Sequence, residues 1–316
     1  MRIAVINDYK DLAREATGWS QLSSNHSVDF YTDFLTDGEP AAKRLAPYDI
    51  VVAAREETQF NRELIEQLPN LKLLVTHATR NAAFDMAALA ERNITVCGTG
   101  YGHANATVEL TWGLILSLFK RIPAEDRGVR DGEWGVDLPL GLTGKTLGVL
   151  GLGGLGSGTA IVGKALQMDV IAWSENLTAE RCAEIGVTLV SRDELFERSD
   201  VLSVHLVLGP RSRGLIGRRE LSQMKPTAYL INTSRGPIVD EPALIDALNS
   251  GAIAGAGLDV FDVEPLPIDH PLRSTPNTVL TPHLGGRTKE NFTARYQDCV
   301  ENVVAWLDGA PVRVMT

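Results

Sequence analysis

Residues 146–156 have the sequence TLGVLGLGGLG. The first five residues predict a short buried strand, and the helical pattern that follows predicts a helix over Gly154–Leu166. Between them lies the pattern G-x-G-x-x-G, formed by Gly151, Leu152, Gly153, Gly154, Leu155 and Gly156. In this strand–turn–helix context, the pattern is typical of a dinucleotide-binding site.

Each glycine of the turn has a physical task. Gly151 permits the tight turn, Gly153 lets the backbone approach a pyrophosphate, and Gly156 lets the helix pack closely on the strand. The helix N-terminus adds free N–H groups and the positive end of the helix dipole. The alternative interpretation is a tight strand-to-helix turn that binds nothing.

An acidic residue is expected about 20 positions further on, where it binds the adenosine ribose diol. Glu175 lies 19 positions after Gly156, just beyond a strand predicted at Asp169–Trp173. Its carboxylate would repel a 2′-phosphate, and no arginine follows at once, so NAD is favoured over NADP. Ser174 stands where an aspartate is more usual. Alternatively, Glu175 is a solvated loop carboxylate and Ser174 and Asn176 share its role.

Short β-branched runs alternate with helical patterns in two series. The first series predicts strands at Arg2–Asn7, Val28–Tyr31, Asp49–Ala53, Leu71–Thr76 and Ile94–Cys97. The second predicts strands at Thr146–Leu150, Asp169–Trp173, Thr188–Val190, Val201–His205, Ala228–Ile231 and Ala256–Leu258. Such alternation with short connections indicates parallel sheets covered by helices on both faces. The predicted fold class is therefore α/β, with two doubly wound parallel-sheet domains.

Helices are expected between these strands and at the end of the chain. Their ranges are Asn61–Leu68, Phe84–Arg92, Gly154–Leu166, Arg192–Arg198, Arg218–Met224, Asp240–Ser250 and Lys289–Asp308. A longer helix over Ala104–Lys120 is apolar nearly all round, which predicts burial between domains or subunits. We expect Pro123 to end it and Glu125–Leu142 to form an irregular connection or an excursion over another surface.

Composition excludes several classes of protein. The chain has 316 residues and a net charge of −10, whereas broad nucleic-acid binding needs a dense cationic surface. No stretch reaches the ~18 uncharged apolar residues of a membrane span, and no secretory signal pattern begins the chain. Cys97, Cys182 and Cys299 are few and scattered, which predicts free buried thiols and no structural zinc. A cytoplasmic protein without metal, membrane or nucleic-acid partners is expected.

Three segments, each interpreted as a loop after a strand, carry the candidate catalytic residues. They are NTSRGPIVD at Asn232–Asp240, LDVFDVEP at Leu258–Pro265 and TPHLGG at Thr281–Gly286. In an open α/β sheet, such loops gather at the carboxyl edge, beside the cofactor crevice.

The residue types in these loops suit the reduction of a 2-keto acid by a hydride. The carbonyl oxygen must then gain a proton, and His283 can supply it because an unperturbed histidine has a pKa of about 6.5. Glu264, hydrogen-bonded to the imidazole, would favour its protonated form and fix its orientation. Arg235 offers a permanent charge and a planar donor fork to the substrate carboxylate or carbonyl. In the oxidative direction, His283 would act as the base.

Each of the three also has a structural alternative. Arg235 could form a surface ion pair, Glu264 could cap the turn before Pro265, and His283 could be an ordinary loop histidine. Five other histidines show that a histidine alone proves little: His26, His77, His103, His205 and His270. His205 ends a predicted strand, and we interpret it as structural or cofactor-lining.

The glycine turn and the three loops, in this order, closely resemble the D-isomer-specific 2-hydroxyacid dehydrogenase family. The resemblance covers nearly the whole chain and is densest from Gly144 to Gly286. It implies that Arg235, Glu264 and His283 are catalytic and that the substrate is a small D-2-hydroxy or 2-keto acid. It also implies a homodimer that associates through the central domain.

The resemblance further implies a domain plan. A discontinuous flavodoxin-like substrate domain, residues 1–100 and 287–316, would flank a Rossmann-type cofactor domain, residues 101–286, with the active site in a cleft between them. Asp259 would contact the nicotinamide carboxamide, although a structural aspartate at a strand end is the alternative. The remaining cofactor-lining candidates are His205, Thr233 and Gly285.

The substrate loop departs from the family pattern. In the family, a Gly-x-Gly in this loop binds the substrate carboxylate through backbone amides, but here the segment is Ala78-Thr79-Arg80. Alanine disfavours positive φ, so the loop backbone is expected to differ. Arg80 either clamps a carboxylate or points away and braces the loop. Tyr101 is a further candidate to line the cleft. Because the family's Gly-x-Gly is replaced, the sequence does not identify the substrate among acids of the glyoxylate and hydroxypyruvate type.

Other functions stay open on the sequence alone. One is an NADP-dependent reductase of the same family. Another is a non-catalytic NAD sensor similar to the transcriptional corepressors that resemble this family, although all three catalytic positions are filled here. A third is an enzyme that oxidises formate or phosphite, which the loop differences disfavour.

Overall fold

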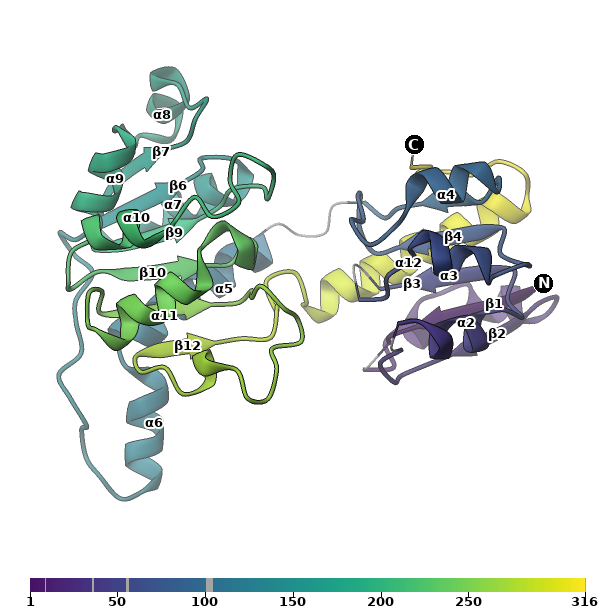
Figure 1. The fold of residues 1–316 in the computed structure, drawn as a ribbon, viewed down its shortest axis with the longest axis horizontal. Helices are drawn as coiled ribbons and strands as arrows, with labels where there is room; N and C mark the ends of the chain where they lie inside the picture. The colour runs from purple at the N-terminus through teal and green to yellow at the C-terminus, as the bar shows by residue number, and fades with distance from the viewer. Residues whose placement is uncertain (9, 36, 55–56, 101–104, 316) are drawn as a thin grey trace. The chain divides into compact units, whose positions relative to one another are not determined.

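The computed structural model describes residues 1–8, 10–35, 37–54, 57–100 and 105–315. The chain divides into two compact units: unit 1 comprises Met1–His103 and Thr288–Thr316, and unit 2 comprises Ala104–Arg287. Each unit is built on one parallel sheet with helices on its faces (Figure 1). The α/β class with two doubly wound sheets is therefore confirmed.

The sheet of unit 1 has the strand order β2-β1-β3-β4-β5, which is the flavodoxin-like order. Its strands are β1 (Arg2–Ile6), β2 (Ser27–Phe30), β3 (Ile50–Ala53), β4 (Leu73–Thr76) and β5 (Thr95–Cys97). Its helices are α1 (Trp19–Ser23), α2 (Glu39–Leu45), α3 (Arg62–Glu66), α4 (Met86–Glu91) and α12 (Lys289–Leu307).

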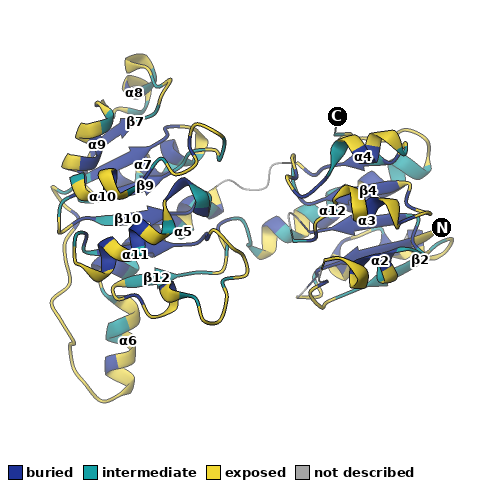
Figure 2. Cartoon of the chain, in the orientation of Figure 1, coloured by how far each residue is buried: buried dark blue, intermediate teal, exposed yellow. Residues whose placement is uncertain are grey.

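Alternate residues of one strand supply two separate cores in unit 1. Ala4 and Ile6 of β1 join the core that includes residues of α2, α3 and α4. Ile3 and Val5 join the core on the other face, which includes residues of α1 and α12. Because successive side chains of a strand point to opposite faces, a sheet covered on both faces needs apolar residues at every position. Figure 2 shows the inner strands as buried accordingly.

The sheet of unit 2 has the order β12-β11-β10-β9-β6-β7-β8. Its strands are β6 (Thr146–Leu150), β7 (Asp169–Trp173), β8 (Thr188–Leu189), β9 (Val201–Val204), β10 (Tyr229–Asn232), β11 (Gly255–Leu258) and β12 (Thr278–Leu280). Counted from β6, this is the Rossmann order with one added strand, and the winding reverses between β6 and β9. Ligands of such sheets bind at this reversal, outside the carboxyl ends of the strands.

Helices cover both faces of this second sheet. They are α5 (Asn105–Phe119), α6 (Ile122–Arg130), α7 (Gly154–Ala165), α8 (Ala179–Ile185), α9 (Arg192–Arg198), α10 (Arg218–Gln223) and α11 (Glu241–Asn249). The long apolar helix α5 packs on α7 and on strands β10 to β12 of its own unit, which accounts for its apolar surface.

The segment after α5 differs from its prediction. Arg121 takes a left-handed φ of 53° between the two helices, and Pro123 lies in the first turn of α6. A proline is tolerated there because the first N–H groups of a helix have no intrahelical acceptor. The expectation that Glu125–Leu142 is irregular throughout was therefore wrong, since its first part is helical.

The structure also contains α1, α2, α8 and β12, which the sequence patterns did not predict. The three cysteines are free and buried, as expected. In the ranges that the structure describes, no helix combines the length and the apolar composition needed to cross a membrane.

Candidate active site

The three predicted catalytic residues follow three neighbouring strands of unit 2. Arg235 comes after β10, Glu264 after β11 and His283 after β12, and these strands lie side by side in the sheet. Because the strands are parallel, all three loops start at the same edge, which is also the edge where the glycine turn follows β6.

Glu264 and His283 are in direct contact. The Nδ1 atom of His283 lies 2.6 Å from Oε2 of Glu264, and Oε1 of Glu264 accepts the N–H of Phe261 at 3.0 Å. Burial raises the pKa of Glu264, but the contacts with His283 and Phe261 and the charge of Arg235 outweigh it, so the pKa lies below its usual value. The carboxylate is thus ionised at neutral pH and can only accept. The proton between them therefore resides on Nδ1 of His283.

Asp259 holds the His283 loop. Its carboxylate accepts the N–H groups of Leu284 and Gly285 at 2.7 and 2.8 Å and the hydroxyl of Thr281 at 2.6 Å. Its carbonyl accepts the N–H of His283 at 2.9 Å, and His283 takes a left-handed φ of 54°, which is uncommon outside glycine. Burial raises the pKa of Asp259, although these donors oppose it. These contacts fix the backbone of the loop that bears His283.

The Arg235 loop is fixed by its own neighbours. The side-chain amide of Asn232 donates to the carbonyl of Arg235 at 3.0 Å and accepts the N–H of Ser234 at 3.0 Å. Nη1 of Arg235 donates to the carbonyl of Ser234 at 2.8 Å. The charge of Arg235 reaches Glu264, where it contributes to the lowered pKa. The structure therefore brings Arg235, Glu264 and His283 into one region of unit 2.

Gly236 is a site residue that sequence reasoning missed. A Cβ atom added to it would lie 2.1 Å from the carbonyl carbon of Phe261, so the Arg235 loop packs directly on the backbone of the Glu264 loop. The only sequence signal was its position next to Arg235, and nothing in the sequence showed what it touches.

The glycine turn has the geometry that a pyrophosphate requires. Gly151 takes a φ of 100°, and a Cβ atom on Gly156 would lie 2.0 Å from the carbonyl oxygen of Gly151. By contrast, a Cβ atom on Gly153 or Gly154 would meet nothing within 4 Å, so this part of the turn borders open space. Gly153, the N-cap of α7, provides no side-chain cap to the first N–H groups of that helix. Leu155 packs against the core of unit 2.

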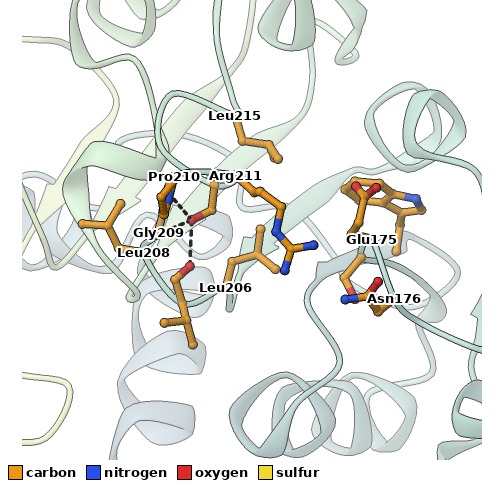
Figure 3. Close-up of a pocket in the computed structure, with 12 residues that line it drawn as sticks. Glu175, Asn176, Leu206, Leu208, Gly209, Pro210, Arg211 and Leu215 are labelled. Carbon is orange, nitrogen blue, oxygen red and sulfur yellow. Dashed lines mark hydrogen bonds between the residues drawn. The ribbon is translucent and has the colours of Figure 1, made fainter. Parts of the chain in front are cut away.

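A pocket of about 390 Å³ lies between the end of β7 and the loop after β9. Its lining consists of Trp173, Ser174, Glu175, Asn176, Leu206, Val207, Leu208, Gly209, Pro210, Arg211, Ser212 and Leu215. Figure 3 shows Glu175 and Asn176 on one side of it, with Leu206 and Arg211 facing them. The structure thus places both predicted ribose residues, Ser174 and Glu175, in a pocket, and it adds Arg211, which the sequence analysis had not singled out.

His205 and Thr233 lie at neighbouring strand ends. Nε2 of His205 is 2.8 Å from the hydroxyl of Ser203, and desolvation lowers the pKa of His205 to about 4. The ring is therefore neutral near pH 7 and unsuited to donating a proton. The buried hydroxyl of Thr233 lies 2.9 Å from that of Thr111 on α5, so Thr233 ties its strand end to the helix.

The predicted substrate loop belongs to unit 1. The carbonyl of Ala78 accepts the N–H of Thr99 at 3.1 Å, whereas Thr79 and Arg80 are exposed. The side chain of Arg80 forms no hydrogen bond or ion pair with any residue that the structure describes. Tyr101, the fourth candidate, lies outside the described residues.

Comparison with known proteins identifies the family of this chain. Residues 112–285 match the family described as D-isomer specific 2-hydroxyacid dehydrogenase, NAD binding domain. The chain is 40% identical to a glyoxylate reductase of Aeropyrum pernix, over 83% of this chain and 84% of that protein. It is 36% identical to a D-3-phosphoglycerate dehydrogenase of Archaeoglobus fulgidus, over 87% of this chain and 52% of that protein.

Solved structures agree with these sequences. A protein of Ralstonia solanacearum, described as a putative D-3-phosphoglycerate dehydrogenase oxidoreductase, superposes with a TM-score of 0.90 at 34% identity. The likeness covers 99% of this chain and 96% of that one. The fold is therefore shared along nearly the whole chain.

Proposed function

Because this chain belongs to the D-isomer-specific 2-hydroxyacid dehydrogenase family of NAD(P)-dependent oxidoreductases, we propose that it reduces a small 2-keto acid with NADH. Acids of the glyoxylate and hydroxypyruvate type are the proposed substrates, in line with the glyoxylate reductase among its relatives. The observation that carries the proposal is the 2.6 Å contact between His283 and Glu264, at the sheet edge that also bears the glycine turn.

The residues of unit 2 fit a dinucleotide. The open glycine turn and the uncapped first N–H groups of α7 would hold the pyrophosphate. Glu175 and Ser174 would bind the adenosine ribose diol, and the carboxylate of Glu175 would favour NADH by repelling a 2′-phosphate. When bound, the cofactor supplies the hydride. Further contacts with it are proposed for His205, Thr233, Asp259 and Gly285.

Three side chains would then donate the proton, orient the donor and bind the negative charge of the substrate. With its Nδ1 proton bonded to Glu264, His283 would use Nε2 to donate a proton to the carbonyl oxygen as that oxygen gains charge. Glu264 would orient the ring and stabilise its positive form. Arg235 would bind the carboxylate or the carbonyl oxygen through its donor fork. His205, neutral near pH 7, is not a competing acid.

Arg80 is the proposed ligand of the substrate carboxylate. Its side chain is exposed and has no hydrogen-bond or ion-pair partner among the described residues, which favours the clamp over the bracing role. A guanidinium can bind a carboxylate through two parallel hydrogen bonds, and it would thus replace the backbone amides of the family's glycine loop.

A homodimer through unit 2 is also proposed. Helix α6 and the segment after it project from the rest of unit 2 (Figure 1). Trp134 and Leu138 in that segment are 94% and 87% exposed, and large exposed apolar side chains mark association surfaces. Sedimentation of a Trp134→Ser, Leu138→Ser variant tests this proposal. A dimer with the same dissociation constant as the wild type would contradict it. A cytoplasmic location stays a prediction.

The proposed reaction is tested by a panel assay. The loss of NADH or NADPH absorbance is followed with glyoxylate, hydroxypyruvate, pyruvate and phenylpyruvate. We expect turnover with at least one of these acids and a higher rate with NADH than with NADPH. If the protein bound NADH but oxidised it with none of them, the non-catalytic sensor would become the better hypothesis.

A further inference from the structure

The pocket beside Glu175 contains a second charged side chain, Arg211. It belongs to the loop after β9, which is anchored by the buried Ser212. The hydroxyl of Ser212 accepts the N–H of Gly209 at 2.9 Å and donates to the carbonyl of Val207 at 2.7 Å. Hydrogen bonds within the loop thus fix its backbone. The Arg211 side chain extends across the pocket towards the segment that bears Glu175 (Figure 3).

The charge of Arg211 is not neutralised by the protein. Its side chain is exposed and forms no hydrogen bond or ion pair with a described residue, and the same holds for Glu175. Arg192, which lies over the Trp173 ring at 5.9 Å, differs in this respect. It donates to Glu220 at 2.9 Å and is thereby paired. Glu175 and Arg211 are therefore the two opposite charges that the pocket lining leaves available to a ligand.

These charges suit the two nicotinamide cofactors differently. NADPH carries a 2′-phosphate on the adenosine ribose, with a charge of roughly −1.5 to −2 near pH 7, where NADH carries a hydroxyl. A carboxylate accepts a hydrogen bond from the hydroxyl but repels the phosphate. A guanidinium binds phosphate through paired, charge-assisted hydrogen bonds.

We propose that Arg211 is a cofactor-specificity residue: its guanidinium binds the 2′-phosphate of NADPH, so the pocket accepts both cofactors, and Glu175 sets the preference for NADH. This inference rests on the proposed function, because it assigns the pocket to the adenosine end of the cofactor. It predicts that the two side chains act against each other, so the effect of removing Glu175 depends on Arg211.

Adenosine 5′-diphosphate and 2′,5′-adenosine diphosphate test this without any turnover. Calorimetric titrations would compare the wild type with Glu175→Gln, Arg211→Gln and the double variant. The matched control is Arg213→Gln, which removes the same charge from an exposed position on the same loop but outside the pocket lining.

Glu175→Gln should tighten binding of 2′,5′-adenosine diphosphate by about tenfold or more, because it removes the repulsion between the carboxylate and the 2′-phosphate and leaves the charge-assisted hydrogen bonds of Arg211 in place. Adding Arg211→Gln should abolish that gain, whereas adding Arg213→Gln should preserve it. The ratio of kcat/KM for NADPH to that for NADH should change in the same order. A gain that survives the loss of Arg211 would overturn the inference and leave the proposed function intact. Failure of the wild type to bind adenosine 5′-diphosphate at all would overturn both.

Discussion

Nδ1 of His283 lies 2.6 Å from Oε2 of Glu264, although the two residues are 19 positions apart and follow different strands. The contact depends on β11 and β12 being parallel neighbours, since only then do their carboxyl ends meet at one edge. A second Glu–His pair, Glu241 with His270 at 3.0 Å, lies in the same unit outside the three proposed catalytic positions. It offers a matched comparison.

Glu264→Gln should lower kcat for keto-acid reduction by up to roughly 100-fold, because it removes the group that orients a histidine whose acid–base catalysis is itself worth about 100-fold or more. Glu241→Gln, assayed in parallel, should change kcat far less. Equal losses in the two variants would assign the Glu264 effect to general disturbance of the loops.

Gly236→Ala should destabilise unit 2, because the new methyl group would collide with the backbone of Phe261. Overpacking of this kind costs typically about 1–3 kcal/mol, which a lower urea midpoint would register. Gly141→Ala is the control, since a Cβ atom there meets nothing within 4 Å. Equal midpoints for the two variants would show that the two loops are not tightly packed.

His205→Gln should make the free energy of unfolding less dependent on pH below pH 6.5. Desolvation lowers the pKa of His205 from 6.5 to about 4 in the folded protein, so below pH 6.5 the unfolded chain binds a proton that the folded chain does not. The free energy of unfolding therefore falls as the pH drops from 6.5 towards 4, by at most roughly 3 kcal/mol from this residue. Urea titrations at pH 7, 5.5 and 4.5 would measure it. The same pH dependence in both proteins would contradict the desolvation of this ring.

Arg80→Ala should raise KM for every accepted keto acid by about tenfold or more, as expected for the loss of a charged carboxylate ligand, while NADH binding stays the same. Arg62→Ala provides a control in the same unit, because Arg62 makes an exposed ion pair with Glu91. If KM were unchanged for all acids, the clamp would be excluded and the bracing role of Arg80 would be preferred.

The sequence predicted the elements whose local pattern is strong. The strands at Thr146–Leu150 and Asp169–Trp173 have the predicted bounds, because both are apolar runs closed by turn residues. Strand β12 (Thr278–Leu280) escaped prediction because it stands directly between Asn277 and the Thr281-Pro282 pair, residues that are typical of loops. Helix α6 was missed for a different reason: a proline ends a helix when it lies inside one, but it also suits a first turn, and only the structure shows which applies.

In the candidate site too, local sequence patterns predicted some features, whereas others depend on contacts between distant loops. The sequence predicted that Arg235, Glu264 and His283 lie at one edge of the sheet, because each stands in a chemically distinctive loop. The contacts of Gly236 and the position of Arg211 in the Glu175 pocket depend on which loops lie together. That information belongs to the tertiary structure, and no spacing in the sequence carries it.

The central claim is that His283 supplies the proton when a keto acid is reduced. The most direct measurement is the turnover of His283→Ala with the best keto acid, alongside the dissociation constant of NADH from its fluorescence. We predict that turnover falls by about 100-fold or more, while NADH binds as in the wild type. Near-normal turnover in that variant would contradict the claim and remove His283 from the mechanism.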